Sequence, residues 1–257
     1  MSLDLTHVLV GVALLFAAFV KGATGLGFPL IATPMVALLL DIRVAVTILI
    51  LPNLLMDITQ VFRDGFPDAV LRRFKSMIGL TIIGVFLGTM VLVLLPLWAL
   101  NFCLGIMVIV FVVSNLLKFD FTISPAAEKI LSPIFGLLSG FLNGMTNAAG
   151  PTLAIYFYSL KLEKRDFVKS VATIFMITKA AQLIAVSTWN LFNWNTLTLS
   201  LQVVLFTLIG FFPLLGHVFG GAIAFGRPTA NQHRAVGAIL LGGSIKCRQM
   251  FFARFAE

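Results

Sequence analysis

Three polar side chains, Asn53, Asp57 and Gln60, recur at helical spacing inside an otherwise apolar stretch. Residues at positions i, i+4 and i+7 share one face of a helix, so these side chains form one polar stripe. Lys179 and Gln182 form a shorter stripe in a second apolar stretch. Such a stripe lines a pathway or holds helices together through hydrogen bonds. We expect Asn53, Asp57, Gln60 and Gln182 to act in gating or coupling.

Lysine and aspartate inside apolar segments are costly and usually face a cavity or a partner. Lys179 lies in the middle of the apolar segment 168–189, where it either attracts an anion or forms a buried ion pair with Asp57. Lys21 either contributes to the same anion site or extends to the membrane interface. Asp57 lies well inside an apolar segment, so proton transfer through a carboxylate would use it. The alternative is that Asp57 has a structural role, as the partner of a buried positive charge.

Two polar breaks with matching residues interrupt the apolar segments. The first is Lys21-Gly22-Ala23-Thr24-Gly25-Leu26-Gly27-Phe28-Pro29 and the second is Asn143-Gly144-Met145-Thr146-Asn147-Ala148-Ala149-Gly150-Pro151. Gly and Pro interrupt a helix and free backbone N–H groups, which lipid cannot satisfy. Each proline stands where a new helix would begin, so two helix N-termini would face the breaks with unpaired donors and partial positive charge.

These donors favour a small anion, in particular an oxyanion such as sulfonate, sulfite or carboxylate. The expected substrate-binding residues are Lys21, Gly22, Thr24, Gly25, Asn143, Gly144, Thr146, Asn147 and Lys179. The alternative is that the breaks are packing kinks, because Gly and Pro are frequent in membrane helices. The recurrence of the break at corresponding positions favours a site.

The composition predicts an integral membrane protein. Of 257 residues, 60% are hydrophobic and only 11% are charged, whereas a soluble domain needs a largely polar exterior. A spanning helix takes about 20 residues, so the chain has room for about eight transmembrane segments. The segments 7–40 and 130–160 are each too short for two full spans, and we interpret each as a hairpin of half-helices. The predicted fold is all-α and polytopic.

The distribution of basic residues predicts the orientation. Four loops gather most of them: Arg63, Arg72, Arg73 and Lys75; Lys118 and Lys129; Lys161, Lys164, Arg165 and Lys169; Arg227 and Arg234. With the N-terminus outside, all four loops fall on the cytoplasmic side, as the positive-inside rule requires. The net charge of +8 is therefore a topology signal, and nucleic acid is not expected as a partner. The basic C-terminal tail departs from this pattern and leaves open whether the segment after Ala235 spans.

A shift of 122 residues superposes the two breaks without a gap. Gly22, Thr24 and Pro29 fall on Gly144, Thr146 and Pro151, and the match extends outward to Gln60 and Gln182. Each hairpin is followed by an odd number of spans, so the second half must be inverted relative to the first. Residues 1–120 and 121–257 are therefore predicted to be two inverted repeats, which is typical of secondary transporters with a site at the repeat interface.

The two breaks and the duplicated layout resemble the sulfite exporter TauE/SafE family, over nearly the whole chain to about Ala230. The resemblance implies a bacterial or archaeal inner-membrane transporter that exports sulfite or organosulfonates such as sulfoacetate, with a homodimer as the expected assembly. It places the substrate at Gly22, Thr24, Gly25, Asn143, Gly144, Thr146 and Asn147. The first break is less glycine-rich than in many members, and the segment 242–248 is more polar than the last helix usually found there.

The predicted function is therefore export of small sulfur-containing anions by alternating access. The alternatives are an importer or channel for other small organic anions, and a non-transporting membrane scaffold. No motif of a membrane enzyme is present, the three histidines do not cluster, and the two cysteines are isolated, so catalysis, a metal and a cofactor are not expected.

Overall fold

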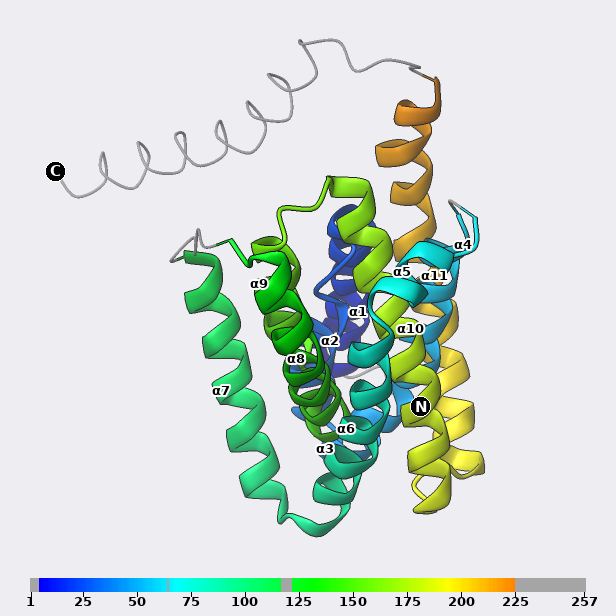
Figure 1. The fold of residues 1–257 in the computed structure, drawn as a ribbon. Coiled ribbons are helices and arrows are strands. Elements are labelled where there is room, and N and C mark those ends of the chain that lie inside the picture. The colour runs from blue at the N-terminus through cyan, green and yellow to red at the C-terminus, as the bar shows by residue number, and fades with distance from the viewer. Residues whose placement is uncertain (1–4, 64, 117–121, 225–257) are drawn as a thin grey trace, which may run out of the picture. The chain divides into compact units, whose positions relative to one another are not determined.

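The computed structural model describes residues 5–63, 65–116 and 122–224, and every regular element in this part of the chain is a helix (Figure 1). By contacts the chain divides into Met1–Leu214 and Leu215–Glu257, and of the second unit the structure describes residues 215–224, the end of the last helix named below. The helices are α1 (Leu5–Thr24), α2 (Phe28–Ala37), α3 (Ile42–Ile48), α4 (Ile50–Phe62), α5 (Asp68–Arg73), α6 (Lys75–Leu94), α7 (Leu97–Leu116), α8 (Pro125–Thr146), α9 (Gly150–Ser159), α10 (Lys164–Thr188) and α11 (Trp194–Ala224).

Four stretches in the described residues are long and apolar enough to cross a membrane. They are Ile42–Phe62, which joins α3 and α4, then Lys75–Leu94, Arg165–Thr188 and Trp194–Phe211. The segments Leu9–Gly22, Phe28–Ala37 and Leu97–Val113 are apolar but shorter. The all-helical membrane architecture agrees with the sequence prediction, whereas the expected number of about eight spans remains a prediction. The segment after Ala235 lies outside the described residues.

Each of the two expected hairpins consists of a long helix followed by a short one. In the first hairpin α1 has 20 residues and α2 has 10, and in the second α8 has 22 and α9 has 10. Helices α1 and α8 are therefore longer than the half-helices expected, although neither is among the four stretches that are long and apolar enough to cross a membrane. The helix ends at Thr24 and Thr146 are 122 residues apart, as are the helix starts at Phe28 and Gly150.

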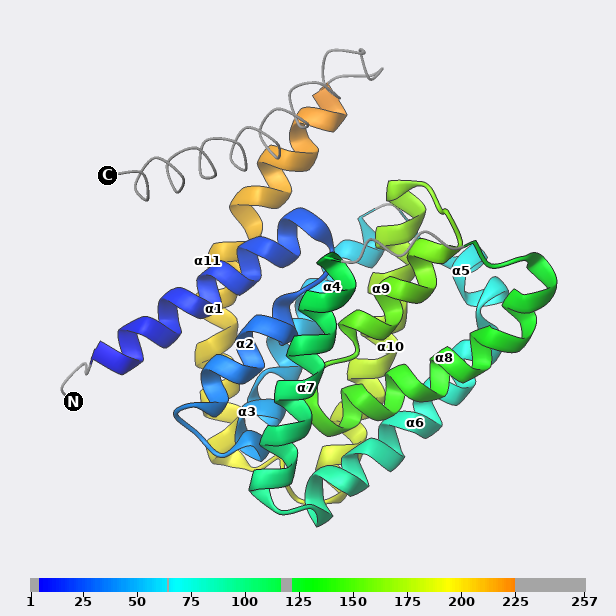
Figure 2. The same ribbon diagram turned by 90° about the vertical axis from the view of Figure 1, so that its left-hand side faces the viewer.

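Helices α6 and α8 run parallel at very close range along a line of glycines (Figure 2). A Cβ added to Gly136, Gly140 or Gly144 would lie 2.4, 2.1 or 2.4 Å from the backbone oxygen of Met77, Thr81 or Val85. The contacting residues advance together along both helices, so the helices point the same way. Small residues allow backbones to approach this closely in membranes. We call this contact the glycine seam.

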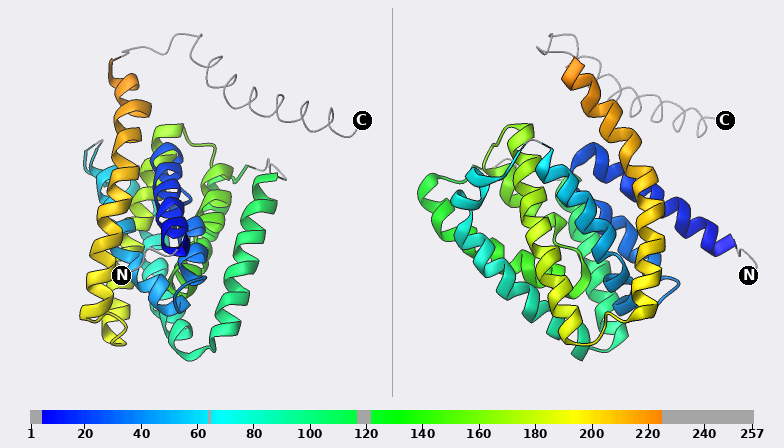
Figure 3. Two further views of the ribbon diagram at one scale, coloured as in Figure 1. Left: turned by 180° about the vertical axis from the view of Figure 1, so that it is seen from behind. Right: turned by 90° about the vertical axis from the view of Figure 1, so that its right-hand side faces the viewer.

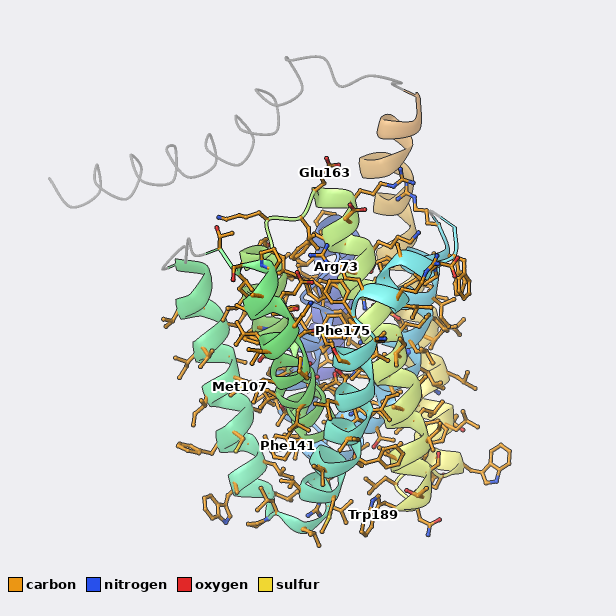
Figure 4. The ribbon with its side chains drawn as sticks, in the orientation of Figure 1. Arg73, Met107, Phe141, Glu163, Phe175 and Trp189 are labelled. Atoms are coloured by element: carbon orange, nitrogen blue, oxygen red, sulfur yellow. The ribbon has the colours of Figure 1, made fainter. Side chains whose placement is uncertain are left out.

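Helices α4 and α10 lie side by side, and they position most of the polar side chains described below (Figure 3). Figure 4 shows Arg73 and Glu163 at one end of the helices and Trp189 at the opposite end, with Phe175 of α10 between these levels. The α5–α6 junction and the start of α10, which carry predicted cytoplasmic basic residues, therefore lie at the same end.

A bidentate ion pair joins the two predicted repeats at this end. Arg73 Nε and Nη2 donate to Glu128 Oε1 and Oε2 over 2.8 and 2.9 Å. The hydrogen bond that Arg73 donates to Glu128 raises the pKa of Arg73 above its ordinary value, and partial burial opposes this effect. Arg73 is 46% exposed and Glu128 17%, so water screens the pair and it contributes only modestly to stability.

Candidate anion site

The backbone turns at the same point in both breaks. Gly25 and Asn147 have positive φ values of 81° and 62°, in the left-handed region that glycine and asparagine tolerate best. The Gly25 N–H donates to the Lys21 carbonyl over 2.8 Å, and the Asn147 N–H donates to the Asn143 carbonyl over 2.9 Å. The half-helices α2 and α9 begin just beyond these turns, and neither has a side-chain hydrogen bond at its N-cap.

A first polar cluster joins the first break to α4. Lys21 Nζ donates to Asp57 Oδ1 over 2.6 Å and also to Asn53 Oδ1. Gln60 Nε2 donates to the main-chain carbonyl of Lys21 over 3.2 Å. None of these four side chains is more than 8% exposed. Lys21 therefore does not reach the membrane interface, and that interpretation was wrong.

A second polar cluster joins the second break to α10. Lys179 Nζ donates to Asn147 Oδ1 over 2.6 Å and to Gln182 Oε1 over 2.7 Å. Asn143 Nδ2 donates to the same Gln182 oxygen over 3.0 Å, while Gln182 Nε2 donates to the Asn143 carbonyl over 3.0 Å. All four side chains are at most 1% exposed.

The two clusters differ in charge. Lys21 has a carboxylate partner, so the first cluster contains an ion pair. In the described residues no carboxylate oxygen lies within 4.0 Å of Lys179 Nζ, and its two hydrogen-bond acceptors are neutral amide oxygens. The predicted alternative of a Lys179–Asp57 ion pair was therefore wrong, because Asp57 is paired with Lys21 instead. An ammonium group has three donors, so one donor of Lys179 has no acceptor in the described residues.

The clusters lie within electrostatic range of one another. Lys179 interacts electrostatically with both Asp57 and Lys21, and Lys21 Nζ lies 5.7 Å from the centre of the Phe175 ring on α10. Phe175 lies between the two ends of the helices in Figure 4. The charged groups therefore form one buried site away from both ends of the spanning helices.

Several buried polar atoms of this site have no protein partner in the described residues. They are Asn53 Nδ2, Asp57 Oδ2, Gln60 Oε1 and Asn143 Oδ1. Buried polar atoms are almost always hydrogen-bonded, to protein, ordered water or ligand. The site therefore has unused capacity for a small polar ligand or for water.

The remaining predicted site residues have other roles or lie at the margin. Gly144 belongs to the glycine seam, and Thr146 Oγ1 donates to the Leu142 carbonyl within its own helix over 3.1 Å. The hydroxyl of Thr146 is therefore used within its own helix, and the role of Thr146 in substrate binding stays a prediction. Gly22 is buried in the last turn of α1. Thr24 ends that helix, and its side chain lies outside the described part.

Sequence reasoning missed two neighbours of the site. Phe175 packs against Lys21, and the Val46 carbonyl accepts a 3.0 Å hydrogen bond from Asn147 Nδ2. The 122-residue shift could have identified Phe175, because it occupies the position equivalent to Asn53 in the polar stripe. A backbone carbonyl has no sequence signature, so Val46 could not have been found in this way.

Apolar helices that enclose buried charged side chains are typical of membrane proteins that bind or move small polar ligands. The chain belongs to the sulfite exporter TauE/SafE family, whose model matches residues 10–247. Membership implies a small anionic substrate and a protein that is not an enzyme. No curated protein and no solved structure matches the chain. Among the described residues no group of His, Cys, Asp and Glu could hold a metal ion.

Proposed function

We propose that this chain exports small sulfur-containing anions, sulfite or organosulfonates, across the inner membrane by alternating access, and that Lys179 binds the anion. The observation that carries the proposal is the environment of Lys179. Its ammonium group is fully buried, contacts two neutral amide oxygens and has one donor to spare. A buried cation without a carboxylate partner is costly, and an anionic ligand would remove that cost.

The proposed site is formed by Lys21, Asn143, Asn147 and Lys179, with Asn53, Asp57, Gln60 and Gln182 linking these residues to the helices that would move. Asn147 supports this assignment because it contacts both Lys179 and the carbonyl of Val46 in α3. Gly22, Thr24, Gly25, Gly144 and Thr146 shape the breaks around the site. The two half-helix N-termini would add backbone donors.

Alternating access is supported by hydrogen bonds that recur 122 residues apart. The Gln60-to-Lys21 bond matches the Gln182-to-Asn143 bond, and each spans 39 residues. The backbone bonds within the two turns and at the two half-helices match in the same way. We interpret residues 1–120 and 121–257 as inverted repeats on this basis. In such transporters one repeat moves against the other around a central site.

Sulfite efflux from proteoliposomes tests the function, with Lys179→Gln as the diagnostic variant. We expect this variant to fold and to lose most of the efflux, because the site loses its unpaired cation. Lys129→Gln is the matched control, since it removes the same charge from an exposed lysine. Efflux by folded Lys179→Gln at the wild-type rate would reject the site. A wild-type protein that neither transports nor binds any anion would favour a scaffold.

A further inference from the structure

The buried charges of the site sum to a single positive charge. In the part of the chain that the structure describes, the charged side chains classed as buried are Lys21, Asp57 and Lys179, each at most 1% exposed. The packed helices α2, α4 and α9 add no other Lys, Arg, Asp or Glu, and those of α6 and α8 lie within the first five residues of each helix. With both lysines protonated and Asp57 ionised, two ammonium groups and one carboxylate leave one positive charge.

Asp57 sets this value. Its Oδ1 lies 2.6 Å from Lys21 Nζ, so it neutralises one of the two lysines and leaves Lys179 uncompensated. Without Asp57, the same site would carry two positive charges. The carboxylate also has a buried oxygen, Oδ2, without a hydrogen-bond partner in the described residues, so it presents negative charge inside the site.

We propose that Asp57 makes the site selective for anions with a single negative charge. This inference rests on the proposed function of the same site and specifies its substrate class. A monoanion brings the buried charge to zero, whereas a dianion leaves one negative charge buried next to a carboxylate. Burying a charge without a counter-charge carries a large desolvation cost, and we expect this cost to weaken binding of a dianion roughly 100-fold. Hydrogensulfite and simple sulfonates are therefore favoured over the sulfite dianion, sulfate and sulfoacetate.

The sharpest test varies the charge of one ligand on the wild-type protein. Methylphosphonate passes from one to two negative charges as the pH rises through neutrality, while methanesulfonate keeps one charge. Isothermal titration calorimetry of the detergent-purified protein at fixed ionic strength gives both affinities across this range. As the pH rises, we expect the affinity for methylphosphonate to fall at least about tenfold relative to the affinity for methanesulfonate. Methanesulfonate also reports any titration of the protein itself.

Two variants assign the effect to Asp57. Asp57→Asn gives the site two positive charges, so the affinity for sulfate should rise at least about tenfold relative to the affinity for methanesulfonate. The double variant Lys21→Gln, Asp57→Asn removes the ion pair and keeps one positive charge. It should therefore bind methanesulfonate more tightly than sulfate, as the wild type is expected to do. The double variant also controls for loss of the Asp57 side chain, since both variants lack the carboxylate.

The outcomes separate this inference from the proposed function. Methylphosphonate and methanesulfonate affinities that change in parallel with pH would overturn single-charge selectivity and leave an anion site standing. An Asp57→Asn protein with the wild-type ratio of sulfate to methanesulfonate affinity would overturn the role of Asp57. If that variant does not fold, the ligand titration on the wild type decides. Folded wild-type protein that binds neither anion would overturn the proposed site itself.

Discussion

Gln60 and Gln182 make the same hydrogen bond in two places. Each donates its side-chain Nε2–H to a main-chain carbonyl 39 residues earlier, Gln60 to Lys21 over 3.2 Å and Gln182 to Asn143 over 3.0 Å. Each bond fastens the last turn of a broken helix to the polar stripe of the spanning helix beside it. The residues whose carbonyls accept these bonds differ in charge, a lysine in one place and an asparagine in the other. Similar backbone geometry thus carries two different charge arrangements.

Asn147 is expected to combine a backbone role and a ligand role that two substitutions separate. Asn147→Gly keeps the left-handed turn but removes the contacts with Lys179 and the Val46 carbonyl, whereas Asn147→Ala also strains the turn by about 1–2 kcal/mol. Both variants should bind methanesulfonate about tenfold more weakly than the wild type. The Asn147→Ala protein should also unfold at a lower temperature than the Asn147→Gly protein. Calorimetry and thermal unfolding in detergent measure the two effects. Wild-type affinity in Asn147→Gly would remove Asn147 from the site.

The glycine seam is expected to tolerate no added methyl group. A Cβ on Gly140 would lie 2.1 Å from the Thr81 carbonyl oxygen, a backbone atom that cannot rotate away. Gly140→Ala should therefore destabilise the protein by about 1–3 kcal/mol through forced separation of α6 and α8. Gly79→Ala in α6 is the control, because nothing lies within 4 Å of an added Cβ there. Similar unfolding temperatures for the two variants would contradict the close approach of these helices.

The Arg73–Glu128 pair should contribute little to stability, and its contribution should not depend on Arg73 protonation at working pH. Since the pKa of Arg73 is raised, the stability it adds is present below the unfolded pKa and is lost only at pH values above any working range. Glu128→Gln should cost about 0.2–1 kcal/mol, with a smaller effect at high salt. Thermal unfolding at two salt concentrations checks this. A loss of several kcal/mol would indicate that the pair is shielded from water.

Inversion of the repeats predicts that equivalent residues lie on opposite sides of the membrane. Leu39 and Lys161 are 122 residues apart, both are exposed, and their N–H groups make matching bonds to Val36 and Tyr158. In a cysteine-free background, Leu39→Cys should react with an impermeant maleimide added to intact cells. Lys161→Cys should react only after permeabilisation. Labelling of both residues from the same side would show that the repeats are parallel. Labelling of Lys161→Cys in intact cells, with Leu39→Cys protected, would show that the chain has the opposite orientation in the membrane.

The sequence was informative where function required unusual residues in apolar surroundings. The breaks, the polar stripes and the buried position of Lys179 were all predicted, because Gly, Pro and charge are conspicuous there. The partner of Asp57 was not predicted, because either lysine satisfies the same charge balance and only the helix packing decides between them. The glycine seam was also missed, since Gly140 and Gly144 have a clear packing role only when α6 is seen beside α8.

The glycine seam has a consequence for how the protein is made. It joins α6, synthesised in the first half of the chain, to α8, synthesised in the second, so neither half can complete its own packing. If the helices insert in chain order, Gly84 and Gly88 of α6, which also pack against α8, stay uncovered until α8 inserts. We therefore expect a half-assembled intermediate, in which α6 is inserted but not yet packed against α8, each time the chain is synthesised.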